Sequence, residues 1–293
     1  MTAPPDATAS LPAVWEIPGA ALSLERPLLL GILNITPDSF SDGGRFLDPR
    51  VALERALRLR EEGADLLDIG GESTRPGAPP VDATEELARV LPVLRLLREK
   101  LDLPLSIDTR KADVARAALR EGASIVNDIS ALGDPEMAAV VAEAGAGLVL
   151  MHMRGTPQTM QRDPRYRDIA AEVAEELEAA LERARAAGIP DERVVVDPGI
   201  GFAKTAEHNL ELLARLELLA RLGRPILLGA SRKAFLGALL GGVPPEERAV
   251  GTAAACVVGL LHGARIFRVH DVGVVRQALE VAEAIRRASP AAV

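Results

Sequence analysis

Eight apolar segments of β-strand length recur along this chain, and each ends in a polar or charged residue before a helical segment begins. Strands that alternate with helices form a parallel sheet, which is either closed into a barrel or open and doubly wound. The chain has no GxGxxG after the first strand and no GxxxxGK[ST], the usual signatures of open-sheet nucleotide binders. We therefore expect an α/β fold with a single (β/α)8 TIM barrel. The strands are expected near residues 28–33, 65–69, 104–107, 123–127, 147–151, 193–197, 225–229 and 265–269.

The rest of the chain fits one barrel without a second domain. Residues 14–24 contain Gly19 between apolar stretches and predict a short N-terminal hairpin that closes the barrel floor. Residues 1–13 are rich in Ala, Pro and Thr, and we expect them to form a disordered tail. Residues 14–293 then form the single barrel domain, which is close to the usual size of this fold. Apolar positions every three or four residues predict helices at 48–62, 84–100 and 166–187.

The composition argues against several classes of function. A net charge of −8 argues against general binding of nucleic acid. No apolar run is long enough to cross a membrane, and residues 1–13 lack the features of a signal peptide. The single cysteine, Cys256, cannot form an internal disulfide and suits a reducing compartment, so we expect a cytoplasmic protein. The excess of arginine over lysine fits either a high-temperature source or a GC-rich genome.

Three of the strand ends carry groups suited to a flat nitrogen heterocycle. Asp108, Asn127 and Asp197 each follow a largely apolar run, and a buried carboxylate is costly unless it meets donors or a cation. A ring with adjacent N–H and NH2 groups would satisfy one carboxylate through two parallel hydrogen bonds. Pterins and guanines both present such an edge. The alternative is that these residues cap helices or brace loops, which is common for one Asp but less so for three polar residues at one barrel mouth.

A second group of strand-end residues is basic. Arg75, Lys233, Arg268 and His270 all lie at or just beyond strand ends. At one rim they would hold a phosphate or a diphosphate, for which arginine offers a fork of donors and lysine a point charge. Scattered surface arginines are the alternative, but lysine is rare in this chain, and the loop before Lys233 could donate N–H groups to an anion.

Two segments that follow strands directly are long for the loops of such a barrel. Residues 34–48 and 72–83 are rich in Gly, Pro, Ser and Asp. Long loops at this face of a barrel often act as lids.

The remaining histidines and the cysteine give weaker signals. His152, His208 and His262 are expected to be structural, and without HxH or HExxH a zinc site is disfavoured. Cys256 lies in the small-residue helix 251–260, where we expect buried core or an interface. Small side chains allow close helix packing, so this helix also predicts a homodimer, unless it packs only on the barrel.

Taken together, eight motifs in order along the chain resemble the dihydropteroate synthase family from about residue 24 onward. The motifs are GILNITPDSFSDGG (31–44), GESTRPGA (71–78), SIDT (106–109), VNDI (126–129), MHMRGTPQTMQ (151–161), DPGIGFAK (197–204), GASRKAFLG (229–237) and RVHD (268–271). Ala203 and Ala234 stand where Gly or Ser would be commoner in that family.

The resemblance implies an enzyme of folate biosynthesis that condenses 6-hydroxymethyl-7,8-dihydropterin diphosphate with p-aminobenzoate, with Mg2+ as cofactor. It implies pterin-binding residues Asp108, Asn127, Met151, Asp197, Phe202, Gly229 and Lys233. It implies diphosphate-binding residues Asn34, Thr74, Arg268 and His270, with Asn34 also a ligand of Mg2+. It implies p-aminobenzoate-binding residues Thr36, Pro37, Phe40, Arg75, Pro76 and Ser231. The catalytic residues would be Asp108, Asp197, Lys233 and Arg268.

The residues suit such a reaction, in which the methylene carbon loses diphosphate and an arylamine attacks. A basic rim and Mg2+ would neutralise the leaving group, and closed loops would keep water from the cation. Two other readings remain: a pterin-dependent methyltransferase, which would not need the basic rim of Lys233, Arg268 and His270, and a non-catalytic pterin-binding barrel, which would not need Arg75 or Ser231.

Overall fold

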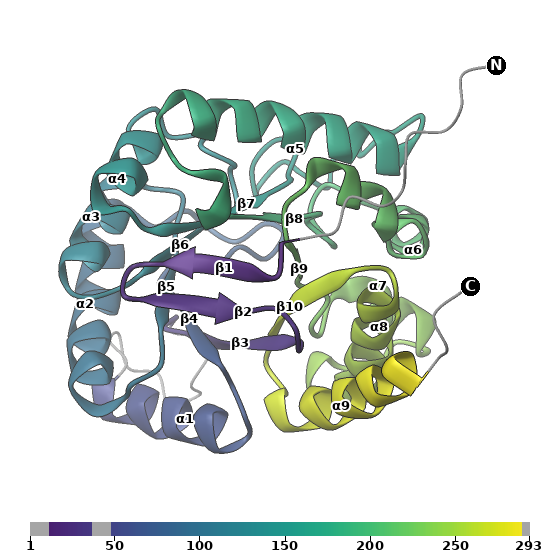
Figure 1. Cartoon of the computed structure of the whole chain (residues 1–293), viewed down its shortest axis with the longest axis horizontal. Helices are drawn as coiled ribbons and strands as arrows, with labels where there is room; N and C mark the ends of the chain where they lie inside the picture. Colours follow the sequence, from purple (N-terminus) through teal and green to yellow (C-terminus); the bar gives the residue numbers. More distant parts are fainter. Residues whose placement is uncertain (1–11, 37–47, 289–293) are drawn as a thin grey trace.

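The chain forms a closed barrel of parallel strands with helices on its outside (Figure 1). A computed structural model describes residues 12–36 and 48–288. The strand order around the barrel is β10-β3-β4-β5-β6-β7-β8-β9, and β10 pairs with both β3 and β9. The strands are β3 (Leu28–Asn34), β4 (Leu66–Gly70), β5 (Leu105–Asp108), β6 (Ile125–Asp128), β7 (Gly147–Met151), β8 (Val194–Asp197), β9 (Ile226–Leu228) and β10 (Ala264–Val269).

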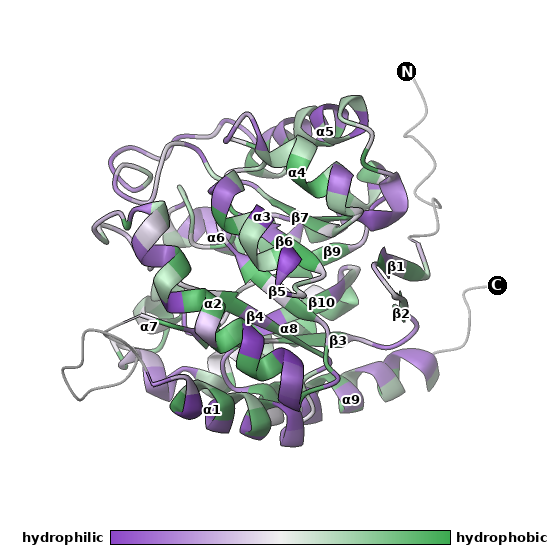
Figure 2. Ribbon diagram, turned by 90° about the vertical axis from the view of Figure 1, so that its left-hand side faces the viewer, coloured by the Kyte–Doolittle hydropathy of each residue, from purple (hydrophilic) through white to green (hydrophobic). Residues whose placement is uncertain are grey.

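A helix follows each strand of the barrel in the chain, and most of these helices bury one apolar face against it. The α-helices are α1 (Pro49–Glu61), α2 (Ala83–Lys100), α3 (Ala112–Arg120), α4 (Met137–Ala144), α5 (Ile169–Ala186), α6 (Ala206–Ala214), α7 (Ala234–Leu239), α8 (Ala249–Leu261) and α9 (Val272–Ala288). In the connections, the described residues include the short 3-10 helices η2 (Asp191–Arg193), η3 (Leu216–Leu222) and η4 (Pro245–Glu247). Figure 2 shows the apolar residues gathered on the strands and polar residues on the outer turns of the helices.

The N-terminal hairpin closes one end of the barrel. Strands β1 (Val14–Ile17) and β2 (Ala20–Ser23) pair antiparallel, with Val14 opposite Ser23. Trp15 is fully buried and donates from Nε1 to the carbonyl of Arg193 at 2.9 Å. Trp15 and Ile17 share an apolar cluster with side chains from inside the barrel, such as Leu30 of β3. The predicted floor is therefore confirmed, and its packing excludes water from that end.

The predicted strands agree with the structure to within two residues at each end. The reason is that both the apolar run and the polar residue that ends it are local properties of the sequence. No helix in the described part of the chain is long and apolar enough to cross a membrane. The predicted tail 1–13 lies outside the described residues, apart from residues 12 and 13.

Candidate active site

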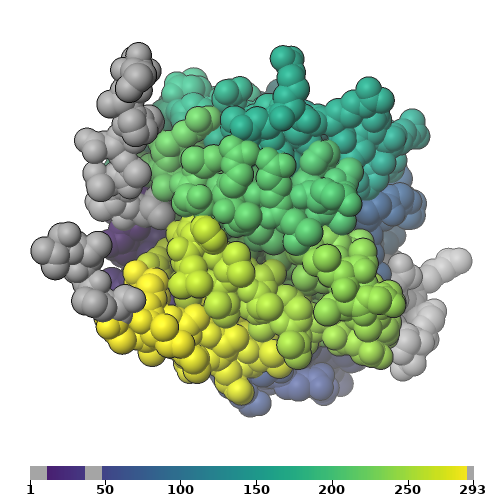
Figure 3. Space-filling view, turned by 90° about the vertical axis from the view of Figure 1, so that its right-hand side faces the viewer, coloured from purple at the N-terminus to yellow at the C-terminus, as the bar shows by residue number. Residues whose placement is uncertain are grey.

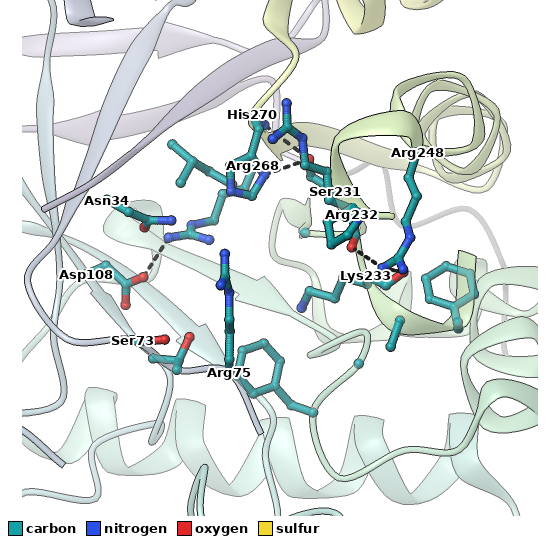
Figure 4. Close-up of a pocket in the computed structure, with 18 of the residues that line it drawn as sticks. Asn34, Ser73, Arg75, Asp108, Ser231, Arg232, Lys233, Arg248, Arg268 and His270 are labelled. Carbon is teal, nitrogen blue, oxygen red and sulfur yellow. Dashed lines mark hydrogen bonds and ion pairs between the residues drawn. The ribbon is translucent and has the colours of Figure 1, made fainter. Parts of the chain in front are cut away.

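A cavity of about 1370 Å³ opens at the carboxyl ends of the barrel strands. All predicted site residues within the described chain line it, including Asn34, Thr36, Asn127, Met151 and Gly229. Figure 4 shows Asn34 and Asp108 on one side of this cavity, Ser231, Lys233 and His270 on the other, and Arg268 between them. Pro37 and Phe40 lie outside the described residues. The barrel thus brings together side chains that are far apart in the chain, while their roles in binding stay predictions.

Arg268 joins two carboxylates across the floor of the cavity. Its Nε donates to Oδ2 of Asp68 at 2.6 Å, and its Nη2 donates to Oδ2 of Asp108 at 2.6 Å. Asn127 donates from Nδ2 to the same oxygen of Asp68 at 3.0 Å. Asp68 is fully buried in β4, so these bonds compensate its lost hydration. The floor is a bonded network that fixes the orientation of Arg268 and Asn127.

Asp197 and Lys233 form a second polar group at the ends of β8 and β9. Oδ1 of Asp197 accepts a 2.7 Å hydrogen bond from the backbone N–H of Gly199. The ammonium group of Lys233 donates to the carbonyl of Ile200 and lies 4.1 Å from the centre of the Phe202 ring. Asp197 caps no helix, because the N-cap of α6 is Thr205, but it braces its own loop, as the alternative reading expects. Its burial and its place in the cavity wall leave it available to a ligand as well.

Burial raises the pKa of the two acids Asp108 and Asp197. It raises the pKa of Asp108 to about 7, although the positive charge of Arg268 acts in the opposite direction. It also raises the pKa of Asp197, which Lys233 and the N–H of Gly199 lower. Because a buried carboxyl group loses hydration, its charged form needs nearby cations. The ionisation of both acids therefore depends on the basic residues around them.

Burial lowers the pKa of the bases Lys233 and His270. Burial lowers the pKa of Lys233 to about 7, against the effect of Asp197. Burial and the nearby charges of Arg268 and Arg232 lower the pKa of His270 to about 3. His270 is therefore neutral at pH 7, which corrects its grouping with the cations. It contributes hydrogen bonds instead, and its Nδ1 lies 3.0 Å from Oγ of Ser231.

The second loop, between β4 and α2, lies over one side of the cavity. Thr74, Arg75 and Pro76 line the cavity, and Figure 4 shows the Arg75 side chain extending into it. The N–H of Gly77 donates to the carbonyl of Pro157 at 3.2 Å, and Nε2 of Gln158 donates to the carbonyl of Ala78 at 3.0 Å. The tip of this loop is thus bonded to the loop that follows β7.

An ion cluster anchors the base of the same loop. Glu72 accepts from Nζ of Lys111 at 2.7 Å, from Nη2 of Arg110 at 3.1 Å and from the N–H of Val81 at 3.2 Å. Lys111 also donates to the fully buried Glu86. Hydrogen bonds to Arg110 and Lys111 lower the pKa of Glu72, outweighing the opposite effect of its burial. This cluster links the second loop to the segment after β5.

Sequence reasoning missed Asp68, Lys204 and the pair of Glu72 and Lys111. Asp68 is inside the apolar run LLDIG, and a charged residue at a strand position with buried neighbours was a usable signal. Lys204 is a buried lysine in the wall of the cavity. Its burial depends on the path of the β8–α6 loop, and no local pattern predicts that path.

The other histidines and Cys256 are structural, as expected. His208 completes the capping box of α6 with Thr205, and His262 ends α8 beside Glu217. His152 is buried at the end of β7. Cys256 is fully buried, and burial raises the pKa of its thiol to about 12.

The small residues of α8 serve the barrel itself. A Cβ added at Gly259 would lie 2.3 Å from Cδ2 of Leu228, so this helix packs directly on β9. Packing on the barrel is therefore shown for Gly259, and the homodimer stays a prediction. An interface formed by α8 would use the opposite side of this helix.

The chain is similar to known pterin-binding proteins over most of its length. The family model described as "Pterin binding enzyme" matches residues 30–270. The dihydropteroate synthase of Synechocystis is 49% identical over 90% of this chain and 91% of its own length.

Two solved structures share the fold at similar identity. Dihydropteroate synthase of Xanthomonas albilineans with 4-aminobenzoic acid has a TM-score of 0.89 and 46% identity, covering 95% of this chain and 99% of the other. The enzyme of Burkholderia cenocepacia complexed with 7,8-dihydropteroate has a TM-score of 0.86 and 48% identity, covering 95% and 98%. With the site motifs in the same cavity, this chain belongs to the dihydropteroate synthase family of pterin-binding enzymes.

Proposed function

We propose that this protein condenses 6-hydroxymethyl-7,8-dihydropterin diphosphate with p-aminobenzoate, giving 7,8-dihydropteroate and diphosphate. The observation that carries the proposal is one cavity lined by buried acids, by Lys233 and Arg268, and by the Arg75 loop. The acids suit a pterin edge, the cations a diphosphate, and the loop an arylamine. Solved relatives at 46% and 48% identity hold 4-aminobenzoic acid and 7,8-dihydropteroate, which supports the same substrate and product here.

The pterin is proposed to lie between Met151 and Phe202 above the floor of the cavity. Asp197 would accept two N–H bonds from the ring, and Asn127 and Asp108 would contact its far side. These side chains are buried in the cavity wall. Carboxylates around the ring stabilise positive charge that develops on the methylene carbon as the leaving group departs. Gly229 and Lys233 would complete the pocket beside Asp197.

The diphosphate is proposed to leave toward Arg268, His270 and Thr74. Arg268 supplies a guanidinium fork, and the neutral His270 supplies an N–H. The C–O bond to diphosphate breaks first, the arylamine then attacks the methylene carbon, and the amine loses its proton. The proposed reaction needs no covalent enzyme intermediate, because the arylamine itself is the nucleophile.

Mg2+ is proposed as the cofactor, with Asn34 as its protein ligand. Asn34 is half-buried at the end of β3, and a Cβ added at Gly70 would lie 3.6 Å from its Oδ1 and 3.6 Å from Asp108. In the described residues, no group of three or more His, Cys, Asp or Glu is arranged to hold a metal. One amide oxygen fits an ion that takes its other ligands from water and substrate phosphate. When bound, Mg2+ would neutralise charge on the leaving diphosphate.

The p-aminobenzoate site is proposed to form from Thr36, Arg75, Pro76 and Ser231, with Pro37 and Phe40 from the first loop. Arg75 suits the carboxylate of this substrate, because a guanidinium and a carboxylate pair in a bidentate way. The two other readings explain less: a methyltransferase does not account for Lys233 and Arg268 beside the pterin pocket, and a binding protein does not account for Arg75 and Ser231.

A homodimer and a cytoplasmic location complete the proposal. Exposed apolar side chains lie on α8 and α9, including Val250, Leu261, Val281 and Ile285. These two helices pack side by side, as the yellow-green and yellow surface in Figure 3 shows. An apolar face of this kind is typical of an interface, and a second copy of the chain would cover it by two-fold symmetry. The free, buried thiol of Cys256 suits a reducing compartment.

The test measures diphosphate release with each substrate alone and with both together. The proposed enzyme releases diphosphate quickly only when dihydropterin diphosphate and p-aminobenzoate are both present, and 7,8-dihydropteroate accumulates in equal amount. Methyl transfer from a reduced folate, or pterin binding without any turnover, would contradict the proposal.

A further inference from the structure

We propose that Lys204 is a positioning residue of this active site, which places a second positive charge beside Asp197 and so keeps that carboxylate ionised for the pterin. The inference rests on the proposed role of Asp197 as the main partner of the pterin ring. Lys204 acts through Asp197 and the loop around it rather than through the reacting atoms.

Lys204 is buried in a way that calls for a reason. Its side chain is only 3% exposed, yet it lines the cavity. Its Nζ lies 2.9 Å from Nδ1 of His152 and donates to the carbonyl of Phe202 at 3.0 Å. A buried ammonium group is costly unless charge and hydrogen bonds compensate it. Neither of these two partners carries a negative charge, so the compensating charge must come from elsewhere.

Glu176 makes His152 an acceptor for Lys204, and Arg154 holds Glu176 in place. Nε2 of His152 lies 3.0 Å from Oε2 of Glu176, and Nε of Arg154 donates to the other oxygen at 2.8 Å. The hydrogen bond from His152 is the main reason that the pKa of Glu176 falls to about 2. Burial lowers the pKa of His152 to about 4, so the ring is neutral. Nε2 therefore carries the proton, and Nδ1 accepts from the ammonium group of Lys204.

Lys204 lies against the loop that holds Asp197. A Cβ added at Gly199 would lie 3.4 Å from Nζ of Lys204, and the N–H of Gly199 is bonded to Oδ1 of Asp197. The backbone N–H of His152, whose ring contacts Lys204, donates to the carbonyl of Asp197 at 2.9 Å. Arg268 is shared by Asp68 and Asp108 through its two hydrogen bonds. Lys233 and Lys204 are therefore the cations near Asp197 that no other buried carboxylate of the floor holds by a hydrogen bond.

Charged groups from several elements surround Asp197 and Lys204. Asp197 faces Lys233 from the segment after β9, Arg268 from β10, Lys204, and the N–H of Gly199. Burial raises its pKa, and these groups lower it.

The surroundings of Lys204 act on it in both directions. Burial and Lys233 lower its pKa, which lies at about 7, while Asp197 and Glu176 raise it and Arg154 lowers it. The Tyr166 ring also lies near, with its centre 6.0 Å from Nζ. Asp197 and Lys204 therefore each favour the charged form of the other.

A bracing role for Lys204 is the competing explanation. The loop from Gly199 to Ala203 is tightly folded: Gly199 has φ 67°, Ala203 has φ 50°, and a Cβ at Gly199 would lie 1.9 Å from the carbonyl oxygen of His152. The bond from Lys204 to the Phe202 carbonyl holds this loop. A test must therefore separate the charge of Lys204 from its hydrogen bonds.

The experiment measures the affinity for 6-hydroxymethylpterin by calorimetry across pH 5.5 to 8.5. Lys204→Gln keeps a hydrogen-bond donor without the charge, and Lys204→Met loses both. Lys100→Met is the matched control, because Lys100 is a surface residue beside Glu99. Protonation of the pterin itself affects the natural protein and all variants equally, so it cancels when their profiles are compared. Circular dichroism checks that each variant is folded.

In both Lys204 variants the acid limb of the profile is expected to move up by about one pH unit, which is a loss of pterin affinity of about tenfold at pH values on that limb. The sign follows because loss of a nearby cation raises the pKa of Asp197, so the carboxylate is protonated at a higher pH. Lys100→Met should match the natural protein. Glu176→Gln removes a negative charge that favours the charged form of Lys204 and that also holds His152 and Arg154. It should give a smaller shift in the same direction, and it carries the test if a Lys204 variant does not fold.

Two outcomes would overturn the inference while leaving the proposed function intact. One is a pH profile of pterin affinity in Lys204→Gln that equals that of the natural protein, which would show that Lys204 only braces the loop. The other is a loss of affinity by the same factor at every pH in both variants. If the natural protein itself fails to bind the pterin, the proposed function fails and this inference fails with it.

Discussion

Nη2 of Arg268 donates a 2.6 Å hydrogen bond to Oδ2 of Asp108, so two side chains assigned to opposite ends of one substrate are bonded to each other. A pterin that takes Oδ2 of Asp108 would displace this ion pair (Figure 4). Asp68 holds Nε of the same guanidinium at 2.6 Å. Arg268 therefore stays fixed to the barrel when Asp108 is released, which prepares it for the leaving group.

Asp68→Ala is expected to lower the free energy of unfolding by about 3–5 kcal/mol, because it leaves one side of a buried ion pair uncompensated. Asp68 is fully buried and also accepts from Asn127. Urea unfolding followed by circular dichroism measures the change. Glu99→Ala, which removes a surface partner of Lys100, is the control and should change little. A loss for Asp68→Ala as small as that of the control would contradict the role of the network.

Asp197→Asn should nearly abolish turnover while the fold survives. The amide oxygen can still accept from the N–H of Gly199, but the NH2 group would face a donor on the pterin. We expect the pterin to bind about 2–5 kcal/mol more weakly, by analogy with buried charge pairs at interfaces. Calorimetry with 6-hydroxymethylpterin and a diphosphate-release assay measure both effects. Unchanged pterin affinity would refute the assignment.

Diphosphate release should require Mg2+, because a metal is needed to neutralise the leaving group. Excess EDTA is expected to stop the reaction, and added Mg2+ should restore it. Asn34→Ala should raise the Mg2+ concentration needed for half-maximal rate, since Asn34 is the proposed protein ligand. Activity that persists in EDTA would show that the metal is not needed. If Asn34→Ala needs the same Mg2+ concentration as the natural protein, Asn34 is not the protein ligand of the metal.

Light scattering at micromolar concentration should give about twice the 31.0 kDa mass of one chain. The reason is the exposed apolar surface on α8 and α9, where Val281 is 62% exposed. Val281→Asp places a charge in this surface and should shift the population toward the monomer. Leu210→Asp on α6, also at an exposed leucine, is the control. A monomeric mass for the natural chain would rule out the dimer.

p-Aminobenzoate is expected to bind weakly alone and more tightly with pterin, diphosphate and Mg2+ present. Its proposed site depends on Arg75 and on the first loop, and Arg75 is exposed in the structure. Diphosphate that draws these loops over the cavity would complete the p-aminobenzoate site. Each ligand must then raise the affinity for the other by the same factor. Sulfonamides, which share the arylamine, should behave alike. Titrations with and without the mixture measure the coupling, and equal affinities would show a preformed site.

The barrel and most of its mouth could be predicted from the sequence because their signals are local. An apolar run that ends at Asp108 or Asp197 marks both a strand and its polar tip, whatever the rest of the chain does. A parallel barrel then places all such tips at one end. The motifs around Arg75 and Lys233 were readable for the same reason.

The tertiary structure alone decided how these groups interact and which of them are charged. Arg268 meets Asp68 across 200 positions of sequence, and Lys204 becomes a buried cation only through the folded path of its loop. His270 is neutral because burial and neighbouring cations lower its pKa to about 3. Gly259 of α8 faces β9 rather than an interface. Desolvation and charge pairing depend on distances between segments far apart in the chain, and no local pattern contains those distances.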